Sequence, residues 1–330
     1  MPSNSSRDSK DAVVNNFPCM ETENACVFCV KNSLGFIVMK IAIASGKGGT
    51  GKTTVATNLA LAASDEGMDV AYMDCDVEEP NGALFLKPEF DDEMPVEVSV
   101  PEIDDAKCVG CGKCGEICQF NAIAVMLKKV FLFPELCHGC AGCWLVCPTG
   151  AIAEARRATG RLEMGSAGKI KFIHGLLNVG EAMSPPVIRG VKSHAPQCDL
   201  LIIDSPPGTS CPVIESVRGA DYVILVTEPT PFGLNDLKLA IDMIKALKLT
   251  FGVVINRADA GDLKTREYCR EFGIEILAEI PDDRRVAVAY SRGDTAYHSI
   301  PEYRDIFNSL LERIVIVVDK RCVSADRRQK

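Results

Sequence analysis

The sequence predicts an α/β protein with a mostly parallel sheet, into which a small cysteine-rich unit is inserted. Short apolar runs of strand length alternate with helical patterns along most of the chain, and this order gives parallel strands with helices on both faces. Sixteen cysteines, most of them bunched, favour metal ligation in a cytoplasmic protein over a secreted disulfide scaffold. The 330 residues, 47% of them hydrophobic, are enough for a large core.

Charge and hydropathy argue against two classes of partner. The net charge of −9 disfavours a nucleic-acid surface and attraction to anionic membranes. No apolar run is long enough to span a bilayer, so we expect no stable membrane insertion and a cytoplasmic location. Residues 1–38 begin polar and irregular and predict a flexible leader. Met39 would make a natural start, so it stays open whether the leader is translated, and its Cys19, Cys26 and Cys29 would form only a weak metal site.

The other elements follow in chain order. The predicted strands cover residues 40–44, 70–74, 199–204, 222–227, 251–255 and 275–280. The predicted helices cover residues 52–64, 233–247 and 262–272, and patches of strand character lie within 160–177. Residues 87–106, with three prolines and many acids, are expected to be linker-like. The apolar run 314–318 is contiguous rather than helically spaced, which predicts a packed end before a basic tail.

A glycine-rich loop lies between the first predicted strand and the first predicted helix. Its sequence at 45–54, Ser-Gly-Lys-Gly-Gly-Thr-Gly-Lys-Thr-Thr, fits the phosphate-loop pattern G-x-x-x-x-G-K-[ST]. Glycines let backbone N–H groups close around phosphate oxygens, and the helix N-terminus adds partial positive charge. Lys52 is expected to reach the β- and γ-phosphates of ATP, and Thr53 to bind Mg²⁺. The expected nucleotide-binding residues of the loop are Gly46, Lys47, Gly48, Gly49, Thr50, Gly51, Lys52, Thr53 and Thr54. A glycine-rich turn that binds nothing is the weaker alternative.

A second lysine in the loop, Lys47, adds a family resemblance. The loop resembles the deviant phosphate loop of the MinD/ParA/Mrp superfamily, which includes the nitrogenase iron protein. The resemblance covers about residues 39–310. It implies a MinD-like P-loop ATPase that forms a face-to-face homodimer with ATP, in which Lys47 reaches the partner's nucleotide.

Further site residues follow the predicted strands, because functional loops of such sheets gather at the carboxyl ends of strands. By the same resemblance, Asp76 lies in switch I and orients the attacking water or Mg²⁺, whereas a turn role stays open for Asp74. Asp204 precedes the Pro-Pro-Gly turn of switch II and would hold the Mg²⁺ shell. Asn256 would hydrogen-bond the adenine edge, and the loop around Pro281 would pack near the base. Hydrolysis is thus expected to depend on Lys47, Lys52, Thr53, Asp76 and Asp204.

Eight cysteines form two runs with the spacing C-x₂-C-x₂-C-x₃-C, 29 residues apart. This duplication resembles a bacterial two-cluster ferredoxin, in which three thiolates of one run and the last of the other hold one [4Fe–4S] cluster. The first set would be Cys108, Cys111, Cys114 and Cys147. The second set would be Cys137, Cys140, Cys143 and Cys118. Zinc usually takes two separated pairs of ligands and fits this spacing poorly.

The predicted organisation is a leader at 1–38, a P-loop ATPase domain at 39–100 and 155–330, and an α+β ferredoxin-like insert at 101–154, placed after the second strand. We expect ATP binding and hydrolysis to close a homodimer and to couple nucleotide state to electron transfer through two [4Fe–4S] clusters to an unidentified redox partner.

The alternative is an ATP-dependent metallocluster assembly or carrier protein with a cluster-accepting partner. Mrp-type carriers use a C-terminal Cys-x-x-Cys, whereas the C-terminal half here has isolated cysteines, namely Cys198, Cys211, Cys269 and Cys322. Cys211 follows switch II and is expected to be a buried, inert thiol. A positioning ATPase that binds membrane or DNA is disfavoured by the acidic charge.

Overall fold

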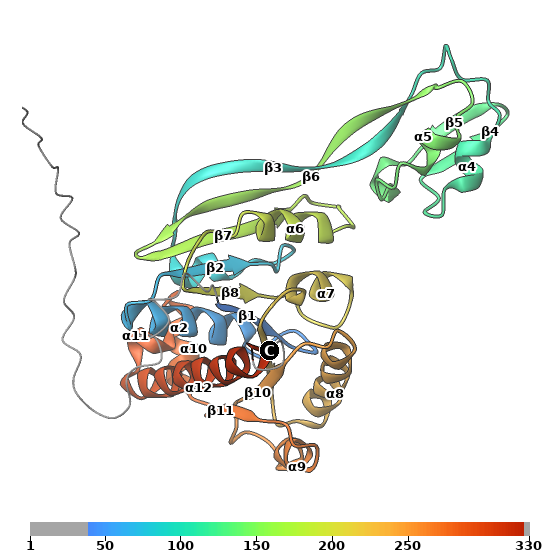
Figure 1. Cartoon of the computed structure of the whole chain (residues 1–330). Coiled ribbons are helices and arrows are strands. Elements are labelled where there is room, and N and C mark those ends of the chain that lie inside the picture. The colour runs from blue at the N-terminus through green and yellow to red at the C-terminus, as the bar shows by residue number, and fades with distance from the viewer. Residues whose placement is uncertain (1–38, 327–330) are drawn as a thin grey trace, which may run out of the picture. The chain divides into compact units, whose positions relative to one another are not determined.

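A computed structural model describes residues 39–326 of the chain, with side chains up to Val318. The expected leader at 1–38 and its three cysteines lie outside the described residues. Among the described residues, one nine-stranded sheet has the order β11-β10-β9-β1-β8-β2-β7-β6-β3 (Figure 1). In that order the strands are Ile276–Ile280, Phe251–Asn256, Tyr222–Thr227, Met39–Ala44, Leu200–Asp204, Val70–Asp74, Ile170–Leu177, Ile152–Ala167 and Glu89–Ile103.

The strands from β11 to β7 run parallel, which confirms the predicted mostly parallel sheet. Only two pairings, that of β6 with β7 and that of β3 with β6, are antiparallel, and both lie at one edge of the sheet. The central strands are apolar throughout because both of their faces are covered by helices. In β1, for example, Ile41 and Ile43 face one side and Ala42 and Ala44 the other, and all four are buried.

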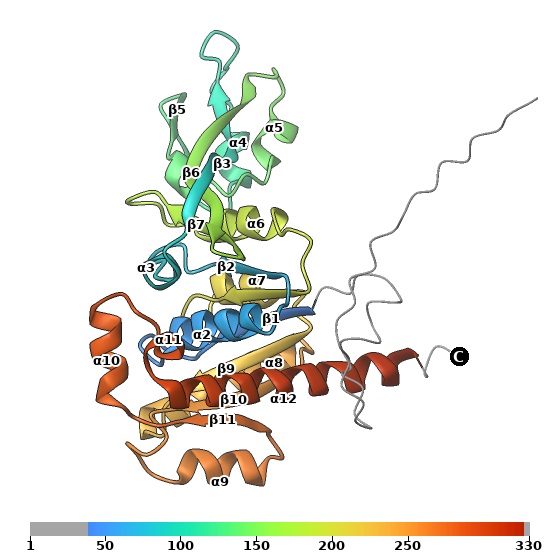
Figure 2. The ribbon, with the colours of Figure 1, turned by 90° about the vertical axis from the view of Figure 1, so that its left-hand side faces the viewer.

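Two layers of helices cover the sheet (Figures 1 and 2). The helices α2 (Lys52–Asp65) and α12 (Pro301–Asp326) lie on one face. The other face carries α6 (Pro185–Ser193), α7 (Cys211–Val217) and α8 (Pro231–Ala246). The shorter helices of this part of the chain are α3 (Gly82–Leu86), α9 (Lys264–Glu271), α10 (Arg284–Ser291) and α11 (Ala296–Ser299). The strands at 70–74 and 222–227 match their predicted bounds, and the other predicted strands and helices differ by one or two residues at their ends.

The expectation of a linker at 87–106 is wrong, because most of this run forms strand β3. The valines at 96, 98 and 100 alternate with polar residues, as a half-buried strand requires. Its prolines are tolerated because β3 is the edge strand of the sheet, where a missing N–H breaks no second ladder. The strand pairs with β6 along its length, from Glu89 opposite Ser166 to Ile103 opposite Ile152.

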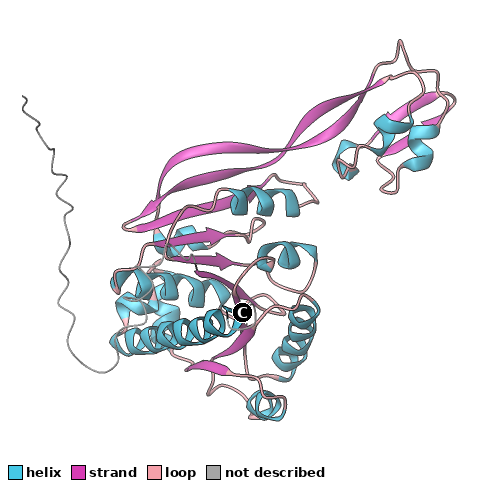
Figure 3. Cartoon of the chain, viewed as in Figure 1, coloured by secondary structure: helices cyan, strands magenta, loops and turns pink. Residues whose placement is uncertain are grey.

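A cysteine-rich unit, residues 104–151, joins the ends of β3 and β6 (Figure 3). It therefore follows the third strand, not the second. The unit contains α4 (Lys113–Ile117), the hairpin β4 (Ile123–Met126) and β5 (Lys129–Leu132), a short 3₁₀ turn (Pro134–Leu136) and α5 (Gly142–Val146). Strands β3 and β6 form the two-stranded ribbon that carries this unit. The outer residues of the predicted insert, 101–103 and 152–154, belong to these two strands.

The apolar run at 314–318 lies inside α12, and its Ile314 and Val318 are buried, so the predicted packed end is confirmed, although the helix that packs there was not predicted. Phe307, Leu310, Leu311, Ile314 and Val318 are all buried and recur at spacings of one helical face. The buried helical face therefore begins at Phe307, seven residues before the run. The residues of the run alone do not show this helical spacing. Within residues 39–326, no helix combines the length and apolar composition that a membrane crossing requires.

The packing of α12 yields a stability test. We expect Phe307→Ala to lower the free energy of unfolding by about 3–5 kcal/mol, because it removes a fully buried ring and leaves a cavity. Ile316→Ala, in the same helix but 45% exposed, is the control and should change it by only about 0.5 kcal/mol. Urea unfolding measures both variants, and equal losses would contradict the described face of α12.

Candidate functional site

The phosphate loop joins the carboxyl end of β1 to α2, in the middle of the sheet. Gly49 and Gly51 have φ values of 77° and 93°, which glycine adopts without strain. A Cβ on Gly51 would lie 2.4 Å from Nδ2 of Asn256, so only glycine fits there. The same Nδ2 donates to the carbonyl oxygen of Thr50 at 2.9 Å. The fold thus brings Asn256, predicted from a distant strand, against the loop.

Lys52 is buried at the start of α2 with carboxylates of two neighbouring strands around it. Burial lowers the pKa of Lys52, and the nearby Asp204, Asp76 and Asp74 oppose that shift. Burial also raises the pKa of Asp76 to about 6, in spite of the attraction of Lys52. A buried ammonium at the N-terminus of the helix that follows a phosphate loop is suited to an anionic ligand such as a phosphate.

Asp204 ends β8 and is fully buried. The Tyr72 hydroxyl donates to its Oδ2 at 2.9 Å, while its Oδ1 is buried and meets no hydrogen-bond donor among the described residues. Burial raises the pKa of Asp204, and Thr53, Lys52 and Tyr72 partly offset this. Thr50 Oγ1 and Ser205 Oγ are also buried there without partners in the described part of the chain. Buried polar atoms are normally satisfied, so the chemistry of this group suits a bound anion or cation.

Asp74, for which the sequence left a turn role open, shapes the following loop. It is fully buried, and its two carboxylate oxygens accept from the backbone N–H groups of Asp76, at 3.1 Å, and Gly82, at 2.9 Å. Burial and the neighbouring Asp204 raise the pKa of Asp74 well above its usual range. Asp74 therefore fixes the course of the predicted switch I, including the position of Asp76.

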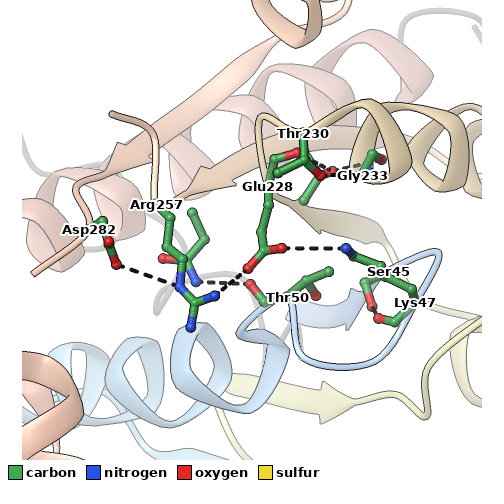
Figure 4. A network of polar contacts seen from close by, with 10 residues as sticks. Ser45, Lys47, Thr50, Glu228, Thr230, Gly233, Arg257 and Asp282 are labelled. Carbon is green, nitrogen blue, oxygen red and sulfur yellow. Dashed lines mark hydrogen bonds and ion pairs between the residues drawn. The ribbon is translucent and has the colours of Figure 1, made fainter. Parts of the chain in front are cut away.

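A chain of ion pairs runs beside the phosphate loop (Figure 4). Glu228, just after β9, lies 3.5 Å from Lys47 Nζ and 2.9 Å from Arg257 Nη1. Arg257 in turn lies 3.6 Å from Asp282, which follows Pro281. Sequence reasoning missed Glu228 and Arg257. Both residues come directly after the end of a strand, and residues in that place lie together at the carboxyl edge of a parallel sheet. This position in the sequence could have indicated them.

The predicted switch II turn lies against the phosphate loop. The N–H of Gly208 donates to the carbonyl oxygen of Ser45 at 3.0 Å, and that of Ser205 donates to Ile43 at 3.0 Å. Helix α7 begins directly after this turn with Cys211, which is exposed. The expectation of a buried thiol is therefore wrong, because the turn places the first residue of α7 at the surface.

Each predicted cysteine set lines one cavity in the cysteine-rich unit. Cys108, Cys111, Cys114 and Cys147 line one of these cavities, which is partly open to solvent. Cys118, Cys137, Cys140 and Cys143 line the other, which is also partly open. Within residues 39–326, no three His, Cys, Asp or Glu side chains converge as ligands of a single metal ion would.

Backbone donors lie close to the sulfurs of the last run. The N–H of Ala151 donates to Cys147 Sγ at 3.2 Å, and the N–H of Gly139 donates to Cys137 Sγ at 3.5 Å. Desolvation alone would raise the pKa of Cys147, but the donors at Ala151 and Thr149 lower it below its usual value. His138 stacks on Phe120 at 3.8 Å between ring centroids and lines the second cavity.

Comparison with known proteins agrees with this geometry. The family model for the CobQ/CobB/MinD/ParA nucleotide binding domain matches residues 41–296. A protein of Methanocaldococcus jannaschii, Uncharacterized protein MJ0578, is 38% identical over 75% of this chain and 86% of its own length. An iron-sulfur cluster carrier protein of the same organism is 25% identical over 88% of each chain.

A solved structure shows the same fold. The septum site-determining protein MinD of Pyrococcus horikoshii, complexed with Mg-ADP, has a TM-score of 0.54 and 21% sequence identity, covering 84% of this chain and 96% of that one. Together with the phosphate loop, these matches establish that the chain belongs to the CobQ/CobB/MinD/ParA family of nucleotide-binding P-loop proteins.

Proposed function

We propose that this protein is an ATP-dependent iron–sulfur cluster carrier that holds two [4Fe–4S] clusters and delivers cluster to an acceptor protein. One observation carries the proposal: two sets of four cysteines, each drawn from both runs, surround two separate cavities in a chain that also has a phosphate loop. Thiolates spaced around a cavity suit a cluster of several atoms rather than a single ion. The relatives named iron-sulfur cluster carrier protein support delivery more than electron transfer.

We expect ATP and Mg²⁺ to bind to the buried polar groups at the carboxyl ends of the parallel strands. Lys52 would bind the phosphates, and Thr53 with the unpartnered Oδ1 of Asp204 would hold Mg²⁺. Asp76 would position the attacking water. Asn256 uses one N–H on Thr50 and keeps its other polar groups for the adenine edge, beside Pro281.

The resemblance also supports an ATP-bound homodimer. Lys47 would then leave Glu228, with which it pairs at 3.5 Å in its own chain, and reach the partner's nucleotide. Its side chain is one-third exposed, so this exchange requires no opening of the core.

Electron delivery through the clusters is the second candidate. The crossed sharing of cysteines is the arrangement of two-cluster ferredoxins, and N–H donors on the sulfurs of Cys147 and Cys137 are a known means of tuning potential. Under this candidate the clusters stay in place and only electrons leave.

A transfer assay separates the two candidates. The anaerobically reconstituted protein is mixed with an apo-ferredoxin with or without Mg-ATP, and cluster is followed on both proteins. We expect ATP to accelerate transfer to the acceptor. Retention of both clusters, with midpoint potentials that move on addition of Mg-ATP, would favour electron delivery. Retention with potentials indifferent to ATP would contradict both.

The two lysines of the loop should differ in effect. Lys52→Ala should abolish both ATP binding and turnover, because it removes the buried ammonium that faces the phosphates. Lys47→Ala should leave ATP binding by one chain nearly intact but prevent ATP-dependent dimerisation and turnover. Calorimetry, light scattering and phosphate release measure the three properties, and full turnover in either variant would contradict the assigned role.

Double cysteine variants test which thiolates share a cluster. In Cys118→Ala/Cys137→Ala both losses fall in one set, so about four irons should remain of the about eight expected for two clusters. In Cys118→Ala/Cys108→Ala the losses fall in different sets, so both clusters should be lost. The uncrossed arrangement predicts the opposite pair of iron contents.

A further inference from the structure

The ribbon that carries the cysteine-rich unit has an irregular joint where it leaves the sheet. Strand β6 pairs with β7 only through residues 160–167, whereas residues 152–158 pair with β3 alone. The register shifts at this boundary: Val96 lies opposite Gly160 and Glu97 opposite Ala158, which leaves Thr159 as an extra residue. This is a β-bulge, which bends and twists a ribbon locally. Thr159 is nevertheless fully buried.

Three hydrogen bonds converge on this bulge. The backbone N–H of Asn178 donates to the Thr159 carbonyl oxygen, and its side-chain Nδ2 donates to that of Ala158, both at 3.0 Å. The Thr159 hydroxyl donates to the carbonyl oxygen of Val96 at 3.2 Å. We call Val96, Ala158, Thr159 and Asn178 the bulge joint. Asn178, the first residue after β7, supplies two of the three bonds, one from its backbone and one from its side chain.

The bulge joint connects directly to the loop that contains Asp76. Leu177, the neighbour of Asn178, donates its N–H to the carbonyl oxygen of Val77 at 2.9 Å. Val77 also packs tightly on β7, because a Cβ on Gly175 would lie 2.8 Å from its Cγ1. The loop after Asp76 is thus joined to the end of β7 by a hydrogen bond and by close packing, and packing of this density transmits displacement.

Helix α6 links the same joint to the switch II side. Lys192 Nζ donates to three carbonyl oxygens at the end of α7, those of Glu215, Ser216 and Arg218, at 2.6, 2.9 and 2.6 Å. On the ribbon side, a Cβ on Gly190 would lie 3.1 Å from Val96. Helix α6 is thus packed between the helix that follows switch II and the bulge joint.

We propose that the bulge joint is the element through which the nucleotide site and the cysteine-rich unit are coupled, with Asn178 as its positioning residue. The proposal rests on the proposed function in one respect, that the nucleotide moves the loops around Asp76 and Gly208. Asn178 holds the bulge against β7, so displacement of β7 changes the ribbon's bend. The outer ribbon and the unit it carries then respond to the nucleotide.

Hydrogen–deuterium exchange on the full, cluster-loaded chain tests this coupling, with and without Mg²⁺ and the slowly hydrolysed analogue ATPγS. In the unchanged protein, the exchange rates of residues 97–103 and 152–160 should differ by about fivefold or more between the nucleotide-free and the ATPγS-bound protein, because a factor of about five is the smallest effect that typical coupling free energies produce. Asn178→Ala removes the Nδ2 bond to Ala158 but keeps the backbone bond to Thr159, so it should clearly reduce that difference while calorimetry shows unchanged nucleotide affinity. Asn308→Ala, the same change in α12, is the control and should keep it.

The outcomes separate this inference from the proposed function. An equal exchange response in Asn178→Ala would overturn the role of the joint and leave ATP-dependent cluster delivery standing. No response in the unchanged protein, with ATPγS bound, would also overturn it, whatever the transfer assay gives. If Asn178→Ala fails to fold, Thr159→Val removes the bond to Val96 at nearly constant volume and should weaken the response likewise.

Discussion

The burial of several charged groups at the carboxyl ends of β1, β2 and β8 is the constraint on which the rest of the site depends. One ammonium, Lys52, lies near the carboxylates of Asp74, Asp76 and Asp204, and all of these groups are buried except Asp76, which is half-buried. Charges buried in this way are stable only with partners that compensate them. Two backbone N–H groups bind Asp74, and the Tyr72 hydroxyl binds Asp204. The remaining unpartnered oxygens are suited to Mg²⁺ and phosphates, whose binding would complete the set.

Holding these groups requires a rigid frame, and the parallel sheet supplies it. Asp74 and Asp204 lie side by side in paired strands, so their separation is fixed by the ladder. The glycines of the phosphate loop remove side chains where Asn256 and the backbone approach closely. Beyond this frame, Glu228 holds Lys47 and Arg257 in place without a ligand. The loop lysine therefore has a defined partner within its own chain.

The cysteine-rich unit is attached through the two strands β3 and β6, and this attachment leaves β3 as an exposed edge of the sheet. Strand β3 is a long edge strand, and exposed edges can pair with other chains. Acidic side chains and two prolines along it, Pro95 and Pro101, oppose such pairing. The bulge at Thr159 divides the ribbon into a part paired with the sheet and a part that continues alone to the cysteines. A regular ribbon would lack this division and the local bend that a β-bulge introduces.

The sequence by itself determined the features encoded within short stretches. The phosphate loop, the buried strands and the mostly parallel sheet follow from local spacing and hydrophobic pattern. Each cysteine set that the ferredoxin resemblance implied lines one pocket, and the clusters themselves stay a prediction. The strand character of residues 89–103 and the helical face of α12 also lay in the pattern, but prolines and a short window concealed them. Only the tertiary structure decided that Glu228 pairs with Lys47, that Cys211 is exposed and that Asn178 binds the bulge. These contacts join residues far apart in the chain or depend on how a turn faces solvent, and no local pattern specifies either.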